Sequence, residues 1–320
     1  SIILQEDVKM AITASMVKEL REMTGVGMLD CKKALAETDG DMEKAVEYLR
    51  EKGLAASEKK AGRIASEGVC LSYLSEDKTT GVIVEVNSET DFVAKNPVFR
   101  EYVLQVAEQI AGSTAADVDA LLTETWKFDT TMTVAEALSS KVAVIGENLK
   151  IRRFEKYVKE GKGIIVSYIH GGGRIGVMID IDCENATEAV EEMGKNIAMQ
   201  IAALNPKFIA TTDVPAEFLA KEKEILTQQA NNDPKNGKKP ANIIEKMIEG
   251  RLNKELKEIC LIEQPYVKDG DLTVKKYIES VSKEVGAPIA IKKMVRFETG
   301  EGLEKKEENF AEEVAKAAKG

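Results

Sequence analysis

The spacing of apolar residues changes along this chain of 320 residues, and that change constrains the fold more than any other feature of the sequence. Between residues 15 and 53, apolar side chains recur at the spacing of amphipathic helices. Residues 68–74 and 81–87 are instead β-rich runs separated by a polar segment, which predicts a hairpin. Because helical and strand segments then follow one another to the C-terminus, we expect an α+β fold with small antiparallel sheets.

The N-terminal part of the chain is predicted to fold as a small domain of three helices. Asp41 follows a Thr-Asp-Gly turn and is a good N-cap for the third helix, which Gly53 is expected to end. Residues 55–65 are rich in Ala and Lys without a wide apolar face, which predicts a linker and leaves open whether it is helical. Met10 and the residues after it resemble an ordinary translation start, so residues 1–9 are treated as an extension or a remnant of cloning.

The remaining elements follow from the same two periods. We expect helices at residues 97–110, 134–144, 187–204, 215–230, 242–259 and 272–285. We expect strands at residues 148–154, 163–169, 174–181 and 287–297. The helix at 242–259 carries one apolar stripe, which predicts an antiparallel hairpin with the helix before it. The stripe consists of Ile244, Met247, Ile248, Leu252, Leu256 and Ile259.

These elements predict several domains in one chain. The two blocks of strands followed by a helix look like a duplicated α+β unit. The expected regions are an extension at 1–9, a three-helix domain at 11–54, a linker at 55–66, a first core subdomain at 67–147, a second core subdomain at 148–204 and 263–299, an inserted helical hairpin at 205–262 and a C-terminal module at 300–320.

The charge and the cysteines restrict the classes of function. Lys and Arg number 45 against 55 Asp and Glu, and the net charge of −10 disfavours broad attraction to nucleic acid or to an anionic membrane. The apolar runs are too short for a membrane helix, and no targeting segment is evident. The four cysteines are far apart and form no Cys-x-x-Cys motif, so we expect reduced thiols and a cytoplasmic location.

No assembled catalytic constellation is evident, and we expect neither a cofactor nor a metal. His170 is the single histidine, and the sequence contains no phosphate-binding P-loop motif. The glycines at 171–173 could form a nest for an anion, but a hairpin turn is the simpler interpretation. Asp180 and Asp182 are expected to be solvated carboxylates on one face of a strand. The short basic groups near Lys60 and at residues 292–296 are expected to be solvated faces.

The segment from Glu85 to Asn96 has an unusual sequence at a junction between a strand and a helix. Thr90 or Asp91 can cap the helix, and Phe92 would then anchor it in the core. Alternatively, Phe92 projects as an apolar wedge beside a charge and enters a partner protein. The residues alone favour the first interpretation.

Two long motifs resemble the signatures of the elongation factor Ts family. They are residues 24–35 (TGVGMLDCKKAL) and 85–95 (EVNSETDFVAK). The resemblance extends from about residue 11 to the C-terminus and includes 145–153 (IGENLKIRR), 170–177 (HGGGRIGV) and 296–304 (RFETGEGLE). It implies an N-terminal domain similar to ubiquitin-associated domains, a two-part core, an inserted hairpin and a C-terminal module.

The resemblance also implies a function. Members exchange guanine nucleotides on elongation factor Tu without covalent chemistry, binding its GDP-bound and nucleotide-free forms and leaving when GTP binds. The resemblance implies that Thr90, Asp91, Phe92 and Val93 disturb the Mg²⁺ site of that GTPase. It therefore favours the interpretation of Phe92 as a wedge that enters a partner over the interpretation as a core anchor. The other partner-binding residues that it implies, or that we expect to add affinity, are Arg21, Met28, Leu29, Lys60, His170 and Phe310.

Two alternatives belong to other classes. The chain could be an adaptor or chaperone-like module that holds a GTPase without releasing its nucleotide. Nucleic-acid binding would predict a steep salt dependence and is disfavoured by the charge balance. The inserted hairpin could also pair two copies of the chain, giving a homodimer.

Overall fold

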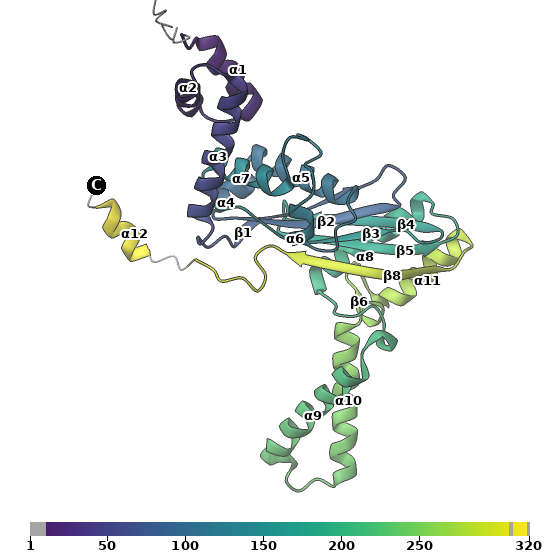
Figure 1. Ribbon diagram of the computed structural model, residues 1–320. Coiled ribbons are helices and arrows are strands. Elements are labelled where there is room, and N and C mark those ends of the chain that lie inside the picture. Colours follow the sequence, from purple (N-terminus) through teal and green to yellow (C-terminus); the bar gives the residue numbers. More distant parts are fainter. Residues whose placement is uncertain (1–10, 307–309, 319–320) are drawn as a thin grey trace, which may run out of the picture. The chain divides into compact units, whose positions relative to one another are not determined.

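The computed structural model describes residues 11–306 and 310–318, within which the chain forms two compact units (Figure 1). The first unit contains the described residues up to Leu71, the segment Val84–Phe154 and those from Thr299 onward. The second contains Ser72–Ile83 and Glu155–Glu298. The expected extension at 1–9 lies outside the described residues.

The three N-terminal helices are α1 (Ala14–Thr24), α2 (Met28–Glu37) and α3 (Met42–Lys60). Asp41 caps α3 as expected, because its side chain accepts a hydrogen bond from the Lys44 amide at 3.1 Å. The three helices enclose a small apolar core made of Val17, Leu20, Cys31, Ala34, Leu35 and Ala45.

The expectation that Gly53 ends α3 is wrong, since the helix continues for seven more residues to Lys60. Gly53 is buried, and a Cβ at this position would lie 3.5 Å from the Cβ of Ala143 in helix α7 (Val134–Ile145). That distance is an ordinary van der Waals contact, so the position would also accept alanine, and packing of α3 against α7 stabilises the helix across the glycine. Residues 55–60 continue the helix because Ala, Glu and Lys are strong helix formers.

The predicted hairpin at 68–87 is confirmed by strands β1 (Glu67–Leu74) and β2 (Thr80–Ser88), which are neighbours in a sheet of order β1-β2-β3. The third strand is β3 (Lys150–Val158). Between β2 and β3 the chain forms α4 (Asp91–Lys95), α5 (Pro97–Ala111), α6 (Val118–Leu122) and α7. Helix α5 contributes most of the large buried side chains of this region, including Phe99, Tyr102, Val103, Val106 and Ile110.

The second unit contains an antiparallel sheet of order β4-β5-β8. Its strands are β4 (Gly163–His170), β5 (Ile175–Cys183) and β8 (Ile289–Glu298). Helix α8 (Glu188–Leu204) packs against β4 and β5, and α11 (Val274–Val285) packs against α8. Because β5 is the central strand, seven of its nine residues are buried.

The inserted hairpin consists of α9 (Ala216–Asn232) and α10 (Ala241–Ile259), which lie side by side in Figure 1. Leu226, Ala230 and Ile248 are buried between these helices. Short 3₁₀ helices occur at Thr211–Asp213, Pro234–Asn236 and Leu261–Glu263, and the two-stranded sheet contains β6 (Pro265–Tyr266) and β7 (Asp269–Thr273).

The start predicted for the helix at 272–285 is two residues too early. Leu272 and Thr273 end β7, and the Thr273 hydroxyl caps α11 by accepting from the Lys276 amide at 3.2 Å. The C-terminal helix α12 spans Phe310–Ala317. Within the described residues, no helix is both long enough and apolar enough to cross a membrane.

Candidate functional site

Phe92 projects from the first turn of α4, and 83% of its surface is exposed. Thr90 caps this five-residue helix, because its hydroxyl accepts a hydrogen bond from the Val93 amide at 3.3 Å. Asp91 is also exposed and pairs with Lys95 at 3.4 Å. The interpretation from the residues alone, that Phe92 anchors the helix in the core, is therefore wrong. Of the two residues predicted to be able to cap the helix, Thr90 and Asp91, Thr90 is the one that does so.

The backbone before α4 is held by a carboxylate from a distant segment. Glu147 accepts hydrogen bonds from the amides of Glu89 and Thr90 at 2.9 and 3.1 Å, and from the Thr90 hydroxyl at 2.5 Å. Glu89 in turn accepts a hydrogen bond from the Asn148 amide at 2.8 Å. Arg63 lies 3.5 Å from the Glu89 carboxylate. These contacts position the backbone immediately before Asp91 and Phe92.

Strand β2, which leads to α4, contains a completely buried carboxylate. Glu85 lies within 3.1 Å of Arg152 and 2.7 Å of Arg153, both on β3. It also accepts hydrogen bonds from the Asn87 side chain at 2.9 Å and from the Gly300 amide at 2.8 Å. The two arginines and two N–H donors compensate for removing the Glu85 charge from water.

Gly300 belongs to the 296–304 motif and explains why that motif contains a glycine. Its φ is +78°, and a Cβ there would lie 2.3 Å from the carbonyl oxygen of Ser66. A larger residue would therefore clash with this oxygen and displace the Gly300 amide, which donates a hydrogen bond to the Glu85 carboxylate.

Helix α2 presents a second exposed apolar group. Leu29 is 84% exposed and Met28 is 50% exposed, and both lie in the first turn of the helix. Arg21 is exposed near the end of α1, and Lys60 is half-buried as the last residue of α3. The structure thus places all four residues on the N-terminal helices, and their roles in binding stay predictions.

His170 is the last residue of β4 and is exposed in the second unit. Its Nδ1 lies 2.8 Å from the Tyr168 hydroxyl. His170 pairs with Ile175 in the sheet, and Gly171 and Gly172 have φ values of +60° and +67° between them. The interpretation of this glycine run as a hairpin turn is therefore confirmed. Phe310 begins α12, and its side chain lies outside the described part of the structure.

The expectation that Asp180 is solvated is wrong, because it is 1% exposed and lies 2.9 Å from the Lys159 amine. Lys159 also contacts Asp182, which is half-buried. Burial lowers the pKa of Lys159, but hydrogen bonds to Asp182 and Asp180 outweigh burial and raise it. The alternation of residues along β5 gives the face on which Asp180 lies. It does not reveal that Lys159, from before β4, covers that face.

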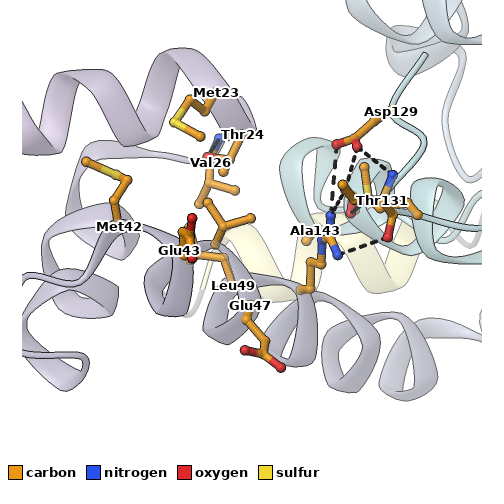
Figure 2. A pocket seen from close by; sticks show the side chains of 14 residues that line it. Met23, Thr24, Val26, Met42, Glu43, Glu47, Leu49, Asp129, Thr131 and Ala143 are labelled. Atoms are coloured by element: carbon orange, nitrogen blue, oxygen red, sulfur yellow. Dashed lines mark hydrogen bonds and ion pairs between the residues drawn. The ribbon is translucent and has the colours of Figure 1, made fainter.

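The first unit also contains a pocket with a volume of about 590 Å³, which no feature of the sequence predicts (Figure 2). Its apolar lining includes Met23, Met42 and Leu49. At its edge Arg50 donates a hydrogen bond to the Thr131 carbonyl at 3.2 Å. The lining comes from three separate segments of the chain, so no local sequence pattern identifies it.

The cysteine side chains lie inside the protein. All four cysteines are free and buried, and burial raises the pKa of the Cys70 thiol to about 12. Within residues 11–306 and 310–318, no three His, Cys, Asp or Glu residues are arranged to hold a metal ion. The prominent features are instead the two exposed apolar groups at helix starts.

Comparison with known proteins identifies the family. The sequence model of the family described as Elongation factor TS matches residues 89–301, more than half of the chain. Elongation factor Ts of Clostridium novyi (strain NT) is 57% identical over 303 residues, which cover 95% of this chain and 97% of the relative. Elongation factor Ts of Clostridioides difficile (strain 630) is 54% identical over 308 residues, or 96% and 99% of the two chains.

Similarity at this level over nearly the whole length identifies the chain as a translation elongation factor. It belongs to the elongation factor Ts family. The resemblance noted in the two sequence motifs is therefore confirmed, as is the α+β fold with small sheets and an inserted helical hairpin.

Proposed function

We propose that this chain is a guanine nucleotide exchange factor for elongation factor Tu. It binds the GDP-bound GTPase, speeds release of GDP and leaves when GTP binds. The observation that carries the proposal is the exposure of 83% of Phe92, the second residue of a helix whose N-terminus is held by Glu147. An aromatic ring that is already exposed can enter a partner without first leaving the core of this protein.

In this proposal the segment of Thr90, Asp91, Phe92 and Val93 disturbs the Mg²⁺ site of the GTPase. The exchange factor forms no covalent bond and works through coupled binding: if it prefers the nucleotide-free partner, GDP weakens its binding by the same factor. Accelerating GDP release about a thousandfold requires a barrier lower by about 4 kcal/mol. Burying one aromatic anchor and weakening the hold on a divalent cation can together supply this amount.

The remaining proposed contacts provide affinity. Leu29 and Met28 offer flexible apolar side chains on α2 that can adapt to a partner surface. We also assign partner contacts to Arg21, Lys60 and His170, by their match to positions in the family, and to Phe310, which we expect to add affinity. The cytoplasmic location expected from the cysteines stays a prediction.

The test is release of fluorescent GDP from elongation factor Tu, chased with excess unlabelled nucleotide. The wild-type chain is expected to accelerate release at substoichiometric amounts, and Phe92→Ala to lower the maximal rate roughly a hundredfold, the loss typical of a strong anchor residue. Leu104→Ala is the matched control, because Leu104 is 49% exposed on α5 outside the proposed site. Tight binding without faster release would instead identify an adaptor.

We further propose that the α9–α10 hairpin can pair two copies of the chain. Ile225 and Ile243 remain 40% and 42% exposed on its two helices, although the hairpin has its own small core. Light scattering measures the mass directly, and a dimer that Ile243→Lys converts to a monomer would support the pairing. A monomer at all concentrations would exclude it.

A further inference from the structure

We propose that Glu147 is a positioning residue for nucleotide exchange, holding the backbone from which Phe92 projects. This inference rests on the proposed function of Phe92, but the contact itself can be tested independently. The Glu147 carboxylate accepts three hydrogen bonds from two consecutive residues, the amides of Glu89 and Thr90 and the Thr90 hydroxyl, at 2.5–3.1 Å.

Helix α4 needs such support because it is only five residues long. A helix of this length is not stable by itself, since nucleation is costly and few backbone bonds follow it. Phe92 is too exposed to be held by its own packing, so its direction depends on the backbone at residues 89–91. Hydrogen bonds to a charged acceptor are stronger than those between neutral groups. Glu147 therefore restricts the backbone at residues 89–91 before binding, so less conformational entropy is lost when the partner binds.

The position of Glu147 is itself fixed by the end of α7. Gly146 terminates this helix with a φ of +84°, and its amide donates to the Val142 carbonyl at 2.8 Å. The chain then turns so that Glu147 reaches residues 89 and 90. The next residue, Asn148, donates its amide to Glu89 at 2.8 Å. The contact is thus reciprocal, because each segment supplies a carboxylate to backbone amides of the other.

Three variants separate positioning from general stability. Glu147→Ala removes all three hydrogen bonds. Glu147→Gln can keep them, because its amide oxygen can accept from the two backbone amides while its NH₂ group donates to the Thr90 hydroxyl oxygen. Glu136→Ala is the matched control: Glu136 caps the start of α7 by accepting from Thr133, but makes none of the contacts at residues 89–90.

Hydrogen–deuterium exchange of the free chain tests the contact without any partner. We expect the peptide covering residues 88–96 to exchange faster in Glu147→Ala than in the wild type, and at wild-type rate in Glu136→Ala. The neutral Glu147→Gln should exchange at a rate closer to that of the wild type than to that of Glu147→Ala. Unchanged protection in Glu147→Ala would overturn the proposal at the level of structure. This result does not depend on whether the chain exchanges nucleotides.

The GDP-release assay then tests the role in exchange. We expect Glu147→Ala to lower the maximal release rate about tenfold or more, because the backbone that it frees must be ordered again each time Phe92 enters the partner. Its affinity for nucleotide-free elongation factor Tu should change less than threefold, and Glu147→Gln should restore the rate. Equal losses of rate and affinity, or no recovery in Glu147→Gln, would overturn positioning. Failure of the wild-type chain to release GDP would instead reject the proposed function.

Discussion

Helices α2 and α4 both present a large apolar side chain at their second residue, but the two helix starts are supported differently. Leu29 is 84% exposed on α2 and Phe92 is 83% exposed on α4. Helix α4 is capped by Thr90, whose backbone and hydroxyl are held by Glu147. Helix α2 begins at Met28, and its N-cap residue Gly27 has no side chain to accept a hydrogen bond from the first turn.

Under the proposed function, this difference predicts a division of roles between two equally exposed residues. A side chain on a fixed backbone can enter a partner with less loss of conformational entropy, because its segment is already ordered before binding. A flexible Met or Leu on a less restrained helix start can adapt to the surface that it covers. Exposure alone therefore does not distinguish a residue that acts on the nucleotide from one that adds affinity.

The largest effect on stability is expected at Glu85, which lies on the strand leading to α4. Glu85→Ala leaves Arg152 and Arg153 without their buried counter-charge, and should lower the free energy of unfolding by about 3 kcal/mol. Denaturant unfolding measures this loss of stability. Glu155→Ala is the control, because Glu155 is exposed and lies on β3, the strand that also contains Arg152. A loss below 1 kcal/mol would show that the network contributes little to the support of α4.

The next effect directly tests the division of roles. Leu29→Ala should weaken association with elongation factor Tu about tenfold, equivalent to about 1.4 kcal/mol, while the maximal rate of GDP release stays unchanged. Titration of the exchange rate against chain concentration separates the two quantities. A lower maximal rate with unchanged affinity would give Leu29 the role proposed for Phe92, and the comparison would fail.

Thr90→Val should cost about 1 kcal/mol of stability, since α4 loses its N-cap and Glu147 loses one donor. It should also lower the maximal rate of GDP release. Thr133→Val is matched to it, because Thr133 caps α7 in the same way through the Glu136 amide. Thermal unfolding and the GDP-release assay together distinguish the variants. Equal rates for both would mean that the cap of α4 has only a structural role.

The smallest effect is expected from giving α2 the cap that it lacks. Gly27 has extended backbone angles, and a Cβ added there would meet no atom within 4 Å, so Gly27→Ser fits without strain. The serine should stabilise the chain by a few tenths of a kcal/mol and leave the rate of GDP release unchanged. Thermal unfolding detects the gain. A change in rate would indicate that restraint of α2 also controls exchange.

The sequence predicted local features well because they depend on residues close together in the chain. Asp41 as an N-cap and the glycine turn after His170 were identified from adjacent residues, and both are confirmed. The end of α3 was predicted wrongly for the opposite reason. A glycine normally weakens a helix, but here the packing of α3 against α7, whose Ala143 comes 90 positions later in the sequence, offsets that cost.

The candidate site required both kinds of information. Residues 85–95 were singled out from the sequence, yet the residues alone favoured a buried Phe92, because an aromatic side chain after an N-cap commonly packs in the core. The support from Glu147 could not be predicted, since it lies 58 residues from Glu89 in the sequence. Asp180 was misjudged similarly, because its partner Lys159 comes from outside the strand.

The family, the order of most helices and strands and the cap of α3 follow from the sequence, because periodicity and capping act over a few residues. Which side chains at those positions are buried and which project becomes clear from the folded chain. Burial and ion pairing depend on segments that meet after folding, as Glu147 meets Thr90 and Lys159 meets Asp180. The free energy of placing a charge or an aromatic ring is therefore set by neighbours that the local sequence does not contain.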